Sequence, residues 1–239
     1  MSRKNQMPEP GNDHLVEQGF TLIELMMTLV ISSFVIIALY ATYTSQQRVY
    51  AVQDQVAAMQ QNIRAGLDIL TRELRLAGYH GTSSTLSPSC NIGAAGAPVA
   101  PGVLSVAANQ LDFSRDLNSD GDCSDPGENL TYALYVAADG VTKLGRRDNN
   151  NAVPAYQAVA DSFDAIEFRY LDKNGLVTTT PADVSLVQVS ILARATRPDD
   201  RFRNTATYTA ASGNVLWVAN DNFRRRFFMT TVQCRNMGL

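Results

Sequence analysis

Histidine and cysteine are scarce in this 239-residue chain, and neither sign of charge is in large excess. There are two histidines, His14 and His80, and three cysteines, none of them in a Cys-x-x-Cys pair. These counts argue against a histidine-rich metal cluster, a zinc site or a thioredoxin-like centre. The sequence also lacks a recognisable Ser/His/Asp set and a glycine-rich phosphate loop. We therefore expect His80 to be structural or solvated, and we do not expect an enzyme.

The charge balance gives no reason to expect a nucleic-acid-binding protein. Twenty basic residues stand against 23 acidic ones, for a net charge of −3. The sharpest basic run is Arg224–Arg226, directly before a predicted strand. Arginines in that place usually form a solvated strand edge that blocks further pairing. Nucleic acid is accordingly not expected as a partner.

A long apolar run follows a short polar segment at the N-terminus. It extends from Phe20 to Tyr43, a stretch of 24 residues. As a helix this stretch is ~36 Å long, enough to cross a hydrocarbon core of ~30 Å. One ionisable residue, Glu24, interrupts it. A charge in a span costs at least ~2.5–3.5 kcal/mol, so Glu24 is a candidate functional residue.

The residues Gly19-Phe20-Thr21-Leu22-Ile23-Glu24 resemble the processing motif of the type IV prepilin class. The resemblance implies that a membrane peptidase cuts after Gly19 on the cytoplasmic face. It also implies that the new terminal residue, Phe20, is then N-methylated, with Glu24 fifth in the mature chain. The alternative is an ordinary signal anchor. A secretory signal peptide fits less well, because the apolar run is too long and lacks a small-x-small cleavage site.

The place of Glu24 predicts a role in assembly. Cleavage leaves a cationic amine on Phe20, and Glu24 of one subunit can meet the amine of a neighbour when parallel spans stack with an axial offset. Two charges that are costly alone in lipid become tolerable as a pair. Glu24 also lies in the first helical turn, where the helix dipole favours an anion. We expect Glu24 to set the axial register of subunits.

Helical spacing continues beyond the span. Apolar residues at steps of three and four form one stripe, which predicts a helix over residues 21–77 that stops at Gly78. The stripe consists of Val52, Val56, Met59, Ile63, Leu67, Leu70 and Leu74. We expect it to pack under a globular head rather than to form a separate partner-binding coiled coil. The stretch Ile63–Tyr79 resembles the PilW subgroup of minor pilins and, more loosely, the J-type pseudopilin of type II secretion.

The remainder of the chain predicts a β-rich head. Residues 80–108 are rich in Gly, Pro, Ser and Ala and are expected to be a loop. Strands are expected at 110–113, 130–137, 142–146, 165–171, 186–196, 205–210 and 227–234, with a helical turn at 158–164. Asp172–Gly175 is typical of a tight turn. The fold class is α+β and pilin-like: one long N-terminal helix packed on an antiparallel β-sheet with long loops.

An acidic stretch from Asp116 to Glu128 predicts a calcium-binding loop. Oxygen-bearing side chains alternate at its start and a glycine, Gly121, follows them. Ca²⁺ takes six to eight oxygen ligands, and this spacing curls several around one point. The second half departs from the EF-hand pattern, so we expect an isolated loop; a solvated acidic turn is the alternative. The candidate ligands are Asp116, Asn118, Asp120, Asp122, Asp125 and Glu128.

The three cysteines, Cys90, Cys123 and Cys234, all follow the apolar run. Downstream of a cytoplasmic start they would lie outside the cytoplasm, where disulfides persist. Three cysteines permit one bridge in three pairings. We favour Cys90 with Cys123, because both lie in loop-like segments.

The resemblance implies a domain order of cleaved leader (1–19), transmembrane segment (20–43), amphipathic helix continuation (44–78) and extracytoplasmic head (79–239). It implies a minor pilin that acts in the initiation, assembly or tip of a type IV pilus. The expected partners are other minor and major pilins, the prepilin peptidase, inner-membrane lipid and the pilus assembly platform.

The expected location is the bacterial inner membrane, with the head in the periplasm and later in the pilus or at its tip. Arg3 and Lys4 favour a cytoplasmic N-terminus. The alternatives are a minor pseudopilin of type II secretion, a calcium-dependent tip adhesin and, least supported, a membrane-anchored hydrolase.

Overall fold

The computed structural model describes residues 19–80 and 100–237. The chain divides into two compact units, residues 1–50 and residues 51–239, and each is described by itself.

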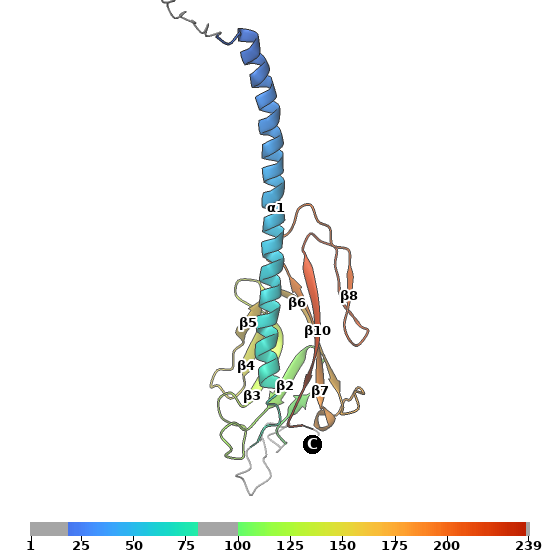
Figure 1. Cartoon of the computed structure of the whole chain (residues 1–239). Coiled ribbons are helices and arrows are strands. Elements are labelled where there is room, and N and C mark those ends of the chain that lie inside the picture. The colour runs from blue at the N-terminus through green and yellow to red at the C-terminus, as the bar shows by residue number, and fades with distance from the viewer. Residues whose placement is uncertain (1–18, 81–99, 238–239) are drawn as a thin grey trace, which may run out of the picture. The chain divides into compact units, whose positions relative to one another are not determined.

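One long helix, α1 (Leu22–Leu74, 53 residues), begins in the first unit and ends in the second (Figure 1). Beyond Leu74 the backbone tightens, and the amide of Ala77 donates to the carbonyl of Leu74 at 3.0 Å. Gly78 then adopts a φ of +77°, a left-handed conformation that ends helices and favours glycine. These bounds agree with the helix predicted over residues 21–77.

In the first unit, α1 is apolar on every face. Each large apolar side chain between Leu22 and Tyr43 is at least 52% exposed. By length and composition α1 qualifies as a membrane span, the one such helix in the described part of the chain. A helix that is apolar all round is stable only when lipid or other helices cover it. The described chain does not supply that cover within this unit.

In the second unit, α1 buries one face. Met59, Ile63, Leu67, Leu70 and Leu74 are buried, and Val52 and Val56 are half-buried. The five buried residues belong to one hydrophobic cluster with strand residues of both larger sheets. The predicted packing of the apolar stripe under the head is therefore confirmed.

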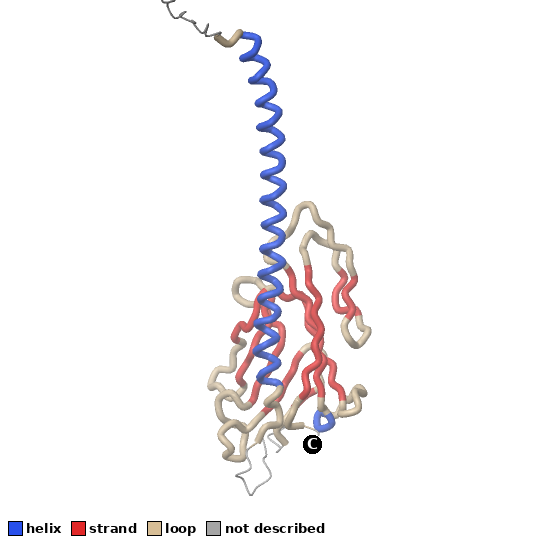
Figure 2. Tube along the Cα trace, viewed as in Figure 1, coloured by secondary structure: helices blue, strands red, loops and turns tan. Residues whose placement is uncertain are grey.

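The head strands form three antiparallel sheets (Figure 2). The strands are β1 (Val103–Ser105), β2 (Gln110–Ser114), β3 (Asn129–Val136), β4 (Thr142–Asp148), β5 (Gln157–Asp161), β6 (Phe163–Leu171), β7 (Leu186–Arg194), β8 (Thr207–Thr209), β9 (Val215–Val218) and β10 (Arg225–Gln233). A short 3-10 helix, η2 (Pro181–Asp183), precedes β7. Five strands pair in the order β1-β2-β3-β4-β5, three in the order β10-β7-β6, and β8 pairs with β9. The α+β class is confirmed, although the head has three sheets rather than one.

Three local predictions need correction. The helical turn expected at residues 158–164 is wrong, because these residues form β5 and the start of β6. Ser162, with a φ of +62°, separates two strands that belong to different sheets. Strand β1 lies in a stretch expected to be a loop, and β9 was not expected. Strands of three or four residues are too short to show a clear two-residue period.

A close approach explains the glycine inside α1. A Cβ placed on Gly66 would lie 2.8 Å from the Cβ of Ala160 and 3.4 Å from Cδ2 of Leu144. Glycine inside a helix costs about 1 kcal/mol relative to alanine. Here it lets α1 lie directly against β4 and β5.

A polar cluster joins the end of α1 to the five-stranded sheet. It consists of Glu73 on α1, Arg115 just after β2, Tyr132 on β3 and Arg146 on β4. Arg146 Nε donates to Glu73 Oε2 at 3.0 Å, Arg115 Nη2 donates to Oε1 at 3.4 Å, and the hydroxyl of Tyr132 donates to Oε2. Burial by itself raises the pKa of Glu73, but hydrogen bonds from Arg146 and Tyr132 outweigh it and hold the pKa below its usual value. The carboxylate thus stays ionised between two arginines.

We expect Glu73→Gln to destabilise the protein by about 3 kcal/mol, because it leaves two largely buried arginines without a counter-charge. The measurement is urea unfolding of the full-length protein in detergent. Asp68→Asn is the matched control on the same helix, since Asp68 pairs with Arg72 where their side chains are 67% and 75% exposed. An exposed pair of this kind contributes about 0.3–0.5 kcal/mol. Equal effects of the two variants would contradict the account.

The same cluster predicts a pH dependence. Folding lowers the pKa of Glu73 from its ordinary value of 4.5. Its contribution to the stability of the protein is therefore complete above pH 4.5. The contribution is lost as the pH falls through the folded-state pKa. Below pH 4.5 the wild-type protein should therefore lose stability more steeply than Glu73→Gln. If the unfolding free energies of the two proteins fell equally with pH, the carboxylate would not be coupled to its arginines.

Candidate functional site

The N-terminal motif forms the cap of α1. Glu24 Oε2 accepts hydrogen bonds from both the backbone amide and the hydroxyl of Thr21, each at 3.0 Å. In return, the amide of Glu24 donates to Thr21 Oγ1 at 3.3 Å. This reciprocal arrangement is a capping box. The sequence reasoning placed Glu24 in the first turn but missed its partner, although the Thr-x-x-Glu spacing indicates such a box.

One oxygen of Glu24 stays available. Both hydrogen bonds that Thr21 donates reach Oε2, and Oε1 accepts no hydrogen bond from the described residues. Phe20 is 86% exposed. A Cβ placed on Gly19 would have no atom within 4 Å, so packing in the described chain does not require glycine there. The motif therefore presents an exposed Gly19-Phe20 pair and a free carboxylate oxygen to groups outside the chain.

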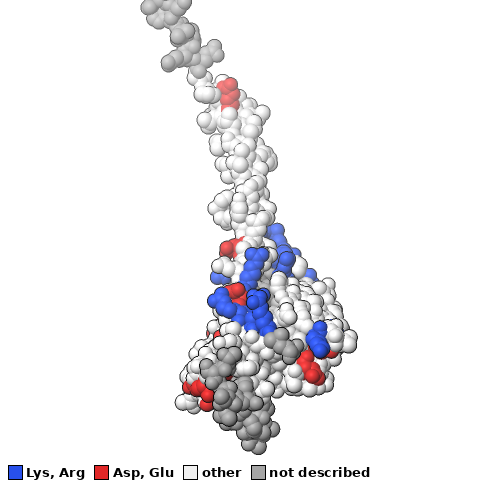
Figure 3. Space-filling model, turned by 60° about the horizontal axis from the view of Figure 1, so that its bottom comes forward, with Lys and Arg blue, Asp and Glu red and all other residues white. Residues whose placement is uncertain are grey.

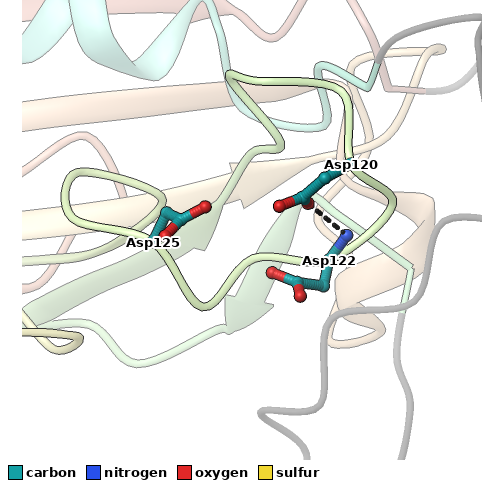
Figure 4. A group of neighbouring side chains, drawn as sticks. All are labelled: Asp120, Asp122 and Asp125. Carbon is teal, nitrogen blue, oxygen red and sulfur yellow. Dashed lines mark hydrogen bonds between the residues drawn. The ribbon is translucent and has the colours of Figure 1, made fainter.

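The acidic loop between β2 and β3 brings some predicted calcium ligands together (Figure 4). Carboxylate oxygens of Asp120, Asp122 and Asp125 lie within 4.8 Å of one another, the one such group in the described ranges. Two ligand oxygens on opposite sides of one Ca²⁺ are about 5 Å apart. The amide of Asn118 bridges this group, donating to Asp120 Oδ2 at 2.9 Å and to Asp125 Oδ2 at 2.6 Å.

The other two predicted ligands serve the backbone of the loop. Asp116 accepts from the amides of Ser119 at 2.6 Å and Gly121 at 3.0 Å. Glu128 accepts from the amides of Leu117 at 2.8 Å and Asp125 at 3.1 Å. Both carboxylates are 1% exposed. They hold the loop in shape and are not part of the three-aspartate group.

Electrostatics keep Asp120 ionised. The amide of Asp122 and the side chain of Asn118 donate to its carboxylate, and these hydrogen bonds lower its pKa. The three aspartates fit a hard cation in donor type, since each offers a carboxylate oxygen. Asn118 turns its amide nitrogen toward Asp120 and Asp125, and its Oδ1 accepts from the amide of Asp120 at 3.1 Å. The aspartates supply fewer than six ligands, so carbonyl groups or water would complete the shell.

The cysteines differ in state. Cys234 is a free thiol and is 1% exposed. Cys123 is 2% exposed and is not free. Cys90 lies outside the described residues. The pairing of Cys90 with Cys123 stays a prediction.

Two family models match the sequence. The model described as Type IV Pilus-assembly protein W matches residues 129–236, from the start of β3 to just beyond β10. The prokaryotic N-terminal methylation motif matches residues 16–40, which include Gly19, Phe20 and Glu24.

Among solved structures, the chain is similar to a type IV-like pilin from Thermus thermophilus, with 18% sequence identity and a TM-score of 0.45. The match covers 75% of this chain and 98% of that chain. A likeness this distant says nothing about the function of this chain. Among curated proteins, no significant match was found.

The state of Cys234 leads to a labelling experiment. Burial raises the pKa of its thiol to about 12, and the thiolate is the reactive form. We expect a maleimide to label the folded full-length protein at Cys234 far more slowly than the unfolded protein, with intact mass and peptide mapping as readout. Cys234→Ser identifies the signal. Rapid labelling of Cys234 in the folded protein would contradict its burial in the core.

Proposed function

This chain is a PilW-type minor pilin of the type IV pilin class, and we propose that it acts by subunit association in the initiation, assembly or tip of a type IV pilus. The observation that carries the proposal is the exposed apolar first half of α1, which begins within the N-terminal methylation motif and holds one carboxylate near its start. Neighbouring pilin helices and lipid are the two surroundings that can cover such a helix.

The proposed assembly step uses the free oxygen of Glu24. After cleavage at Gly19, the amine of Phe20 is cationic and lies at the apolar start of the helix. Glu24 Oε1 of an adjacent subunit accepts from this amine, while Oε2 continues to cap its own helix through Thr21. Pairing lets each charge offset the cost of placing the other in a low-dielectric environment. The axial offset between neighbours is then set by one contact.

The head would determine which other pilins the subunit binds. In this proposal the prepilin peptidase acts at the cytoplasmic face, and the head projects into the periplasm until the assembly platform moves the subunit into the pilus. Other minor pilins and the major pilin are the proposed partners. The membrane anchor itself is supported by the methylation motif and the apolar helix.

The two roles of Glu24 can be separated by substitution. Glu24→Ala removes both the cap and the pairing carboxylate, whereas Thr21→Ala weakens the cap and keeps the carboxylate. Each 1.4 kcal/mol of lost pairing lowers association about tenfold. We therefore expect Glu24→Ala to lower recovery of this subunit in sheared pili by at least about tenfold, with Thr21→Ala close to wild type.

Processing is the control for that experiment, because both variants should lose their first 19 residues normally. If Thr21→Ala fails as severely as Glu24→Ala, the carboxylate acts through helix capping and the pairing step is wrong. If Glu24→Ala assembles normally, the residue has no role in assembly.

The nearest alternative is a minor pseudopilin of a type II secretion system. It shares the processing motif and the long helix, so the geometry of α1 does not separate the two functions. A deletion strain separates them: loss of pili supports the proposal, and loss of secreted enzymes with normal pili supports the alternative.

We further propose that the loop over residues 116–128 binds Ca²⁺ through Asp120, Asp122 and Asp125, with Asn118 beside them. The close approach of three carboxylates favours this proposal. A bound cation would relieve their mutual repulsion and stabilise the loop. A calcium-dependent tip adhesin is the alternative function that such a site would serve, and it predicts ligand binding by a protein whose deletion leaves pilus number unchanged.

Calcium binding can be tested by thermal unfolding of the full-length protein with Ca²⁺ or with EGTA. At Ca²⁺ 100-fold above Kd, binding stabilises by about 2.7 kcal/mol, which corresponds to roughly 5–10 °C in Tm. Asp122→Asn combined with Asp125→Asn should abolish the shift. Asp54→Asn, an exposed aspartate on α1, should preserve it. An EGTA-insensitive Tm with no calcium detected by atomic spectrometry would exclude the site.

A further inference from the structure

Two loops at one end of the head are joined into a single surface. The first loop follows β7 over residues 195–206, and the second lies between β9 and β10 over residues 219–224. Their backbones pair: Asn204 donates to Asp221 at 2.7 Å, Asp199 to Asn222 at 2.9 Å, and Ala195 to Arg224 at 2.8 Å. The loops therefore present their side chains together.

Part of the charge in this region is neutralised internally. Arg224 pairs with Asp199 at 2.8 Å and lies over the ring of Phe202. Arg225, whose side chain is fully buried, pairs with Asp221 at 2.6 Å and with Asp164. These pairs build the loops and are not available to a partner.

Four further arginines are exposed and have no acidic partner among the described residues: Arg197, Arg201, Arg203 and Arg226. Among the described residues, only Arg203 of these four makes a side-chain hydrogen bond, donating to the amide oxygen of Asn220 at 2.6 Å. We call these four residues the arginine surface. Asp200 is the single exposed acidic residue within the two loops.

The excess of arginine over acidic residues is local to this region. Residues 194–226 hold seven arginines, against Asp199, Asp200, Asp221 and the paired Asp164. By contrast, the chain after Gly19 holds 18 basic and 20 acidic residues, because residues 1–19 contain two basic and three acidic ones. Figure 3 shows Lys and Arg side chains gathered on the part of the head around the helix. An exposed cluster of positive charge in a slightly acidic protein favours an anionic partner.

The position of the loops along the chain identifies that partner. Arg194, Ala195 and Thr196 line a hollow together with Gln55, Met59 and Asn62 of α1. In the sequence, Gln55 follows Tyr43, the end of the apolar run, by 12 residues. The chain that carries these arginines also carries the membrane anchor, and tethering to the same bilayer gives a high effective concentration of headgroups.

We propose that the arginine surface binds the anionic phospholipid headgroups of the bilayer that holds the anchor, before the subunit enters a pilus. Guanidinium groups bind phosphate oxygens in a bidentate manner and are less strongly hydrated than ammonium groups. Exposed arginines near an anionic lipid surface each contribute favourably, and the contributions add across a cluster. The contact with headgroups rests on the membrane anchor, and its timing before assembly rests on the proposed function. Headgroup binding would hold the head at the membrane until other pilins engage it.

The test is hydrogen exchange of the full-length protein in nanodiscs of neutral phosphatidylcholine or of phosphatidylcholine with phosphatidylglycerol. We expect amides of residues 195–206 and 219–224 to exchange about tenfold more slowly in the anionic discs at low salt. The difference should vanish at 0.5 M salt, where the screening length is ~4 Å. Quenching of Trp217, the single tryptophan, by a nitroxide-headgroup lipid should rise in the same discs.

A triple variant, Arg197→Gln, Arg201→Gln and Arg203→Gln, should abolish the protection. The matched control changes the same number of exposed charges elsewhere: Arg75→Gln, Lys173→Gln and Arg235→Gln. Equal exchange in the two kinds of disc, or equal loss in both triple variants, would overturn the proposal. Protection by a DNA duplex or by an added pilin in neutral discs, without protection by anionic lipid, would also overturn it.

Discussion

The apolar first half of α1 is the constraint on which the account depends. Its large side chains are more than half exposed, and a single carboxylate lies near its start. A helix of this kind needs lipid or like helices on all sides, and an ion within it needs a counter-ion. Glu24 caps its own helix through Thr21 with one oxygen. In the proposed assembly step, the other oxygen accepts from the amine of a neighbouring subunit, and this arrangement would meet both needs. Membrane anchoring and assembly then follow from the same surface.

The second half of the helix has a different role, because it packs against the head and its separate sheets. Its buried stripe contributes to a core shared by the two larger sheets. Gly66 allows the helix to approach β4 and β5, and Glu73 fixes its last turns to Arg115 and Arg146. A buried ion cluster is weak evidence for stability in itself, but loss of one member leaves the others unpaired. The cluster thereby specifies one position of the helix against the sheet.

Local patterns in the sequence predicted the features that depend on local physics. The three- and four-residue spacing from Val52 to Leu74 predicted the buried face, and Gly78 predicted the helix end. Contacts between residues far apart in sequence were not predictable: Glu73 meets Arg146 across 73 positions, and β5 and β6 separate at Ser162 only because they join different sheets. The acidic loop shows both outcomes, since its oxygen pattern is consistent with three clustered aspartates but did not reveal that Asp116 and Glu128 bind backbone amides.

The central claim is that residues 1–19 are removed so that Phe20 becomes a methylated amino terminus that pairs with Glu24 of another subunit. Intact mass and N-terminal peptide mass spectrometry of the protein from its own host test this most directly. The account predicts a chain that begins at N-methyl-Phe20. A protein that keeps its first 19 residues in cells with an active prepilin peptidase would contradict it, and the chain would then be a membrane-tethered β-rich domain without the proposed assembly step.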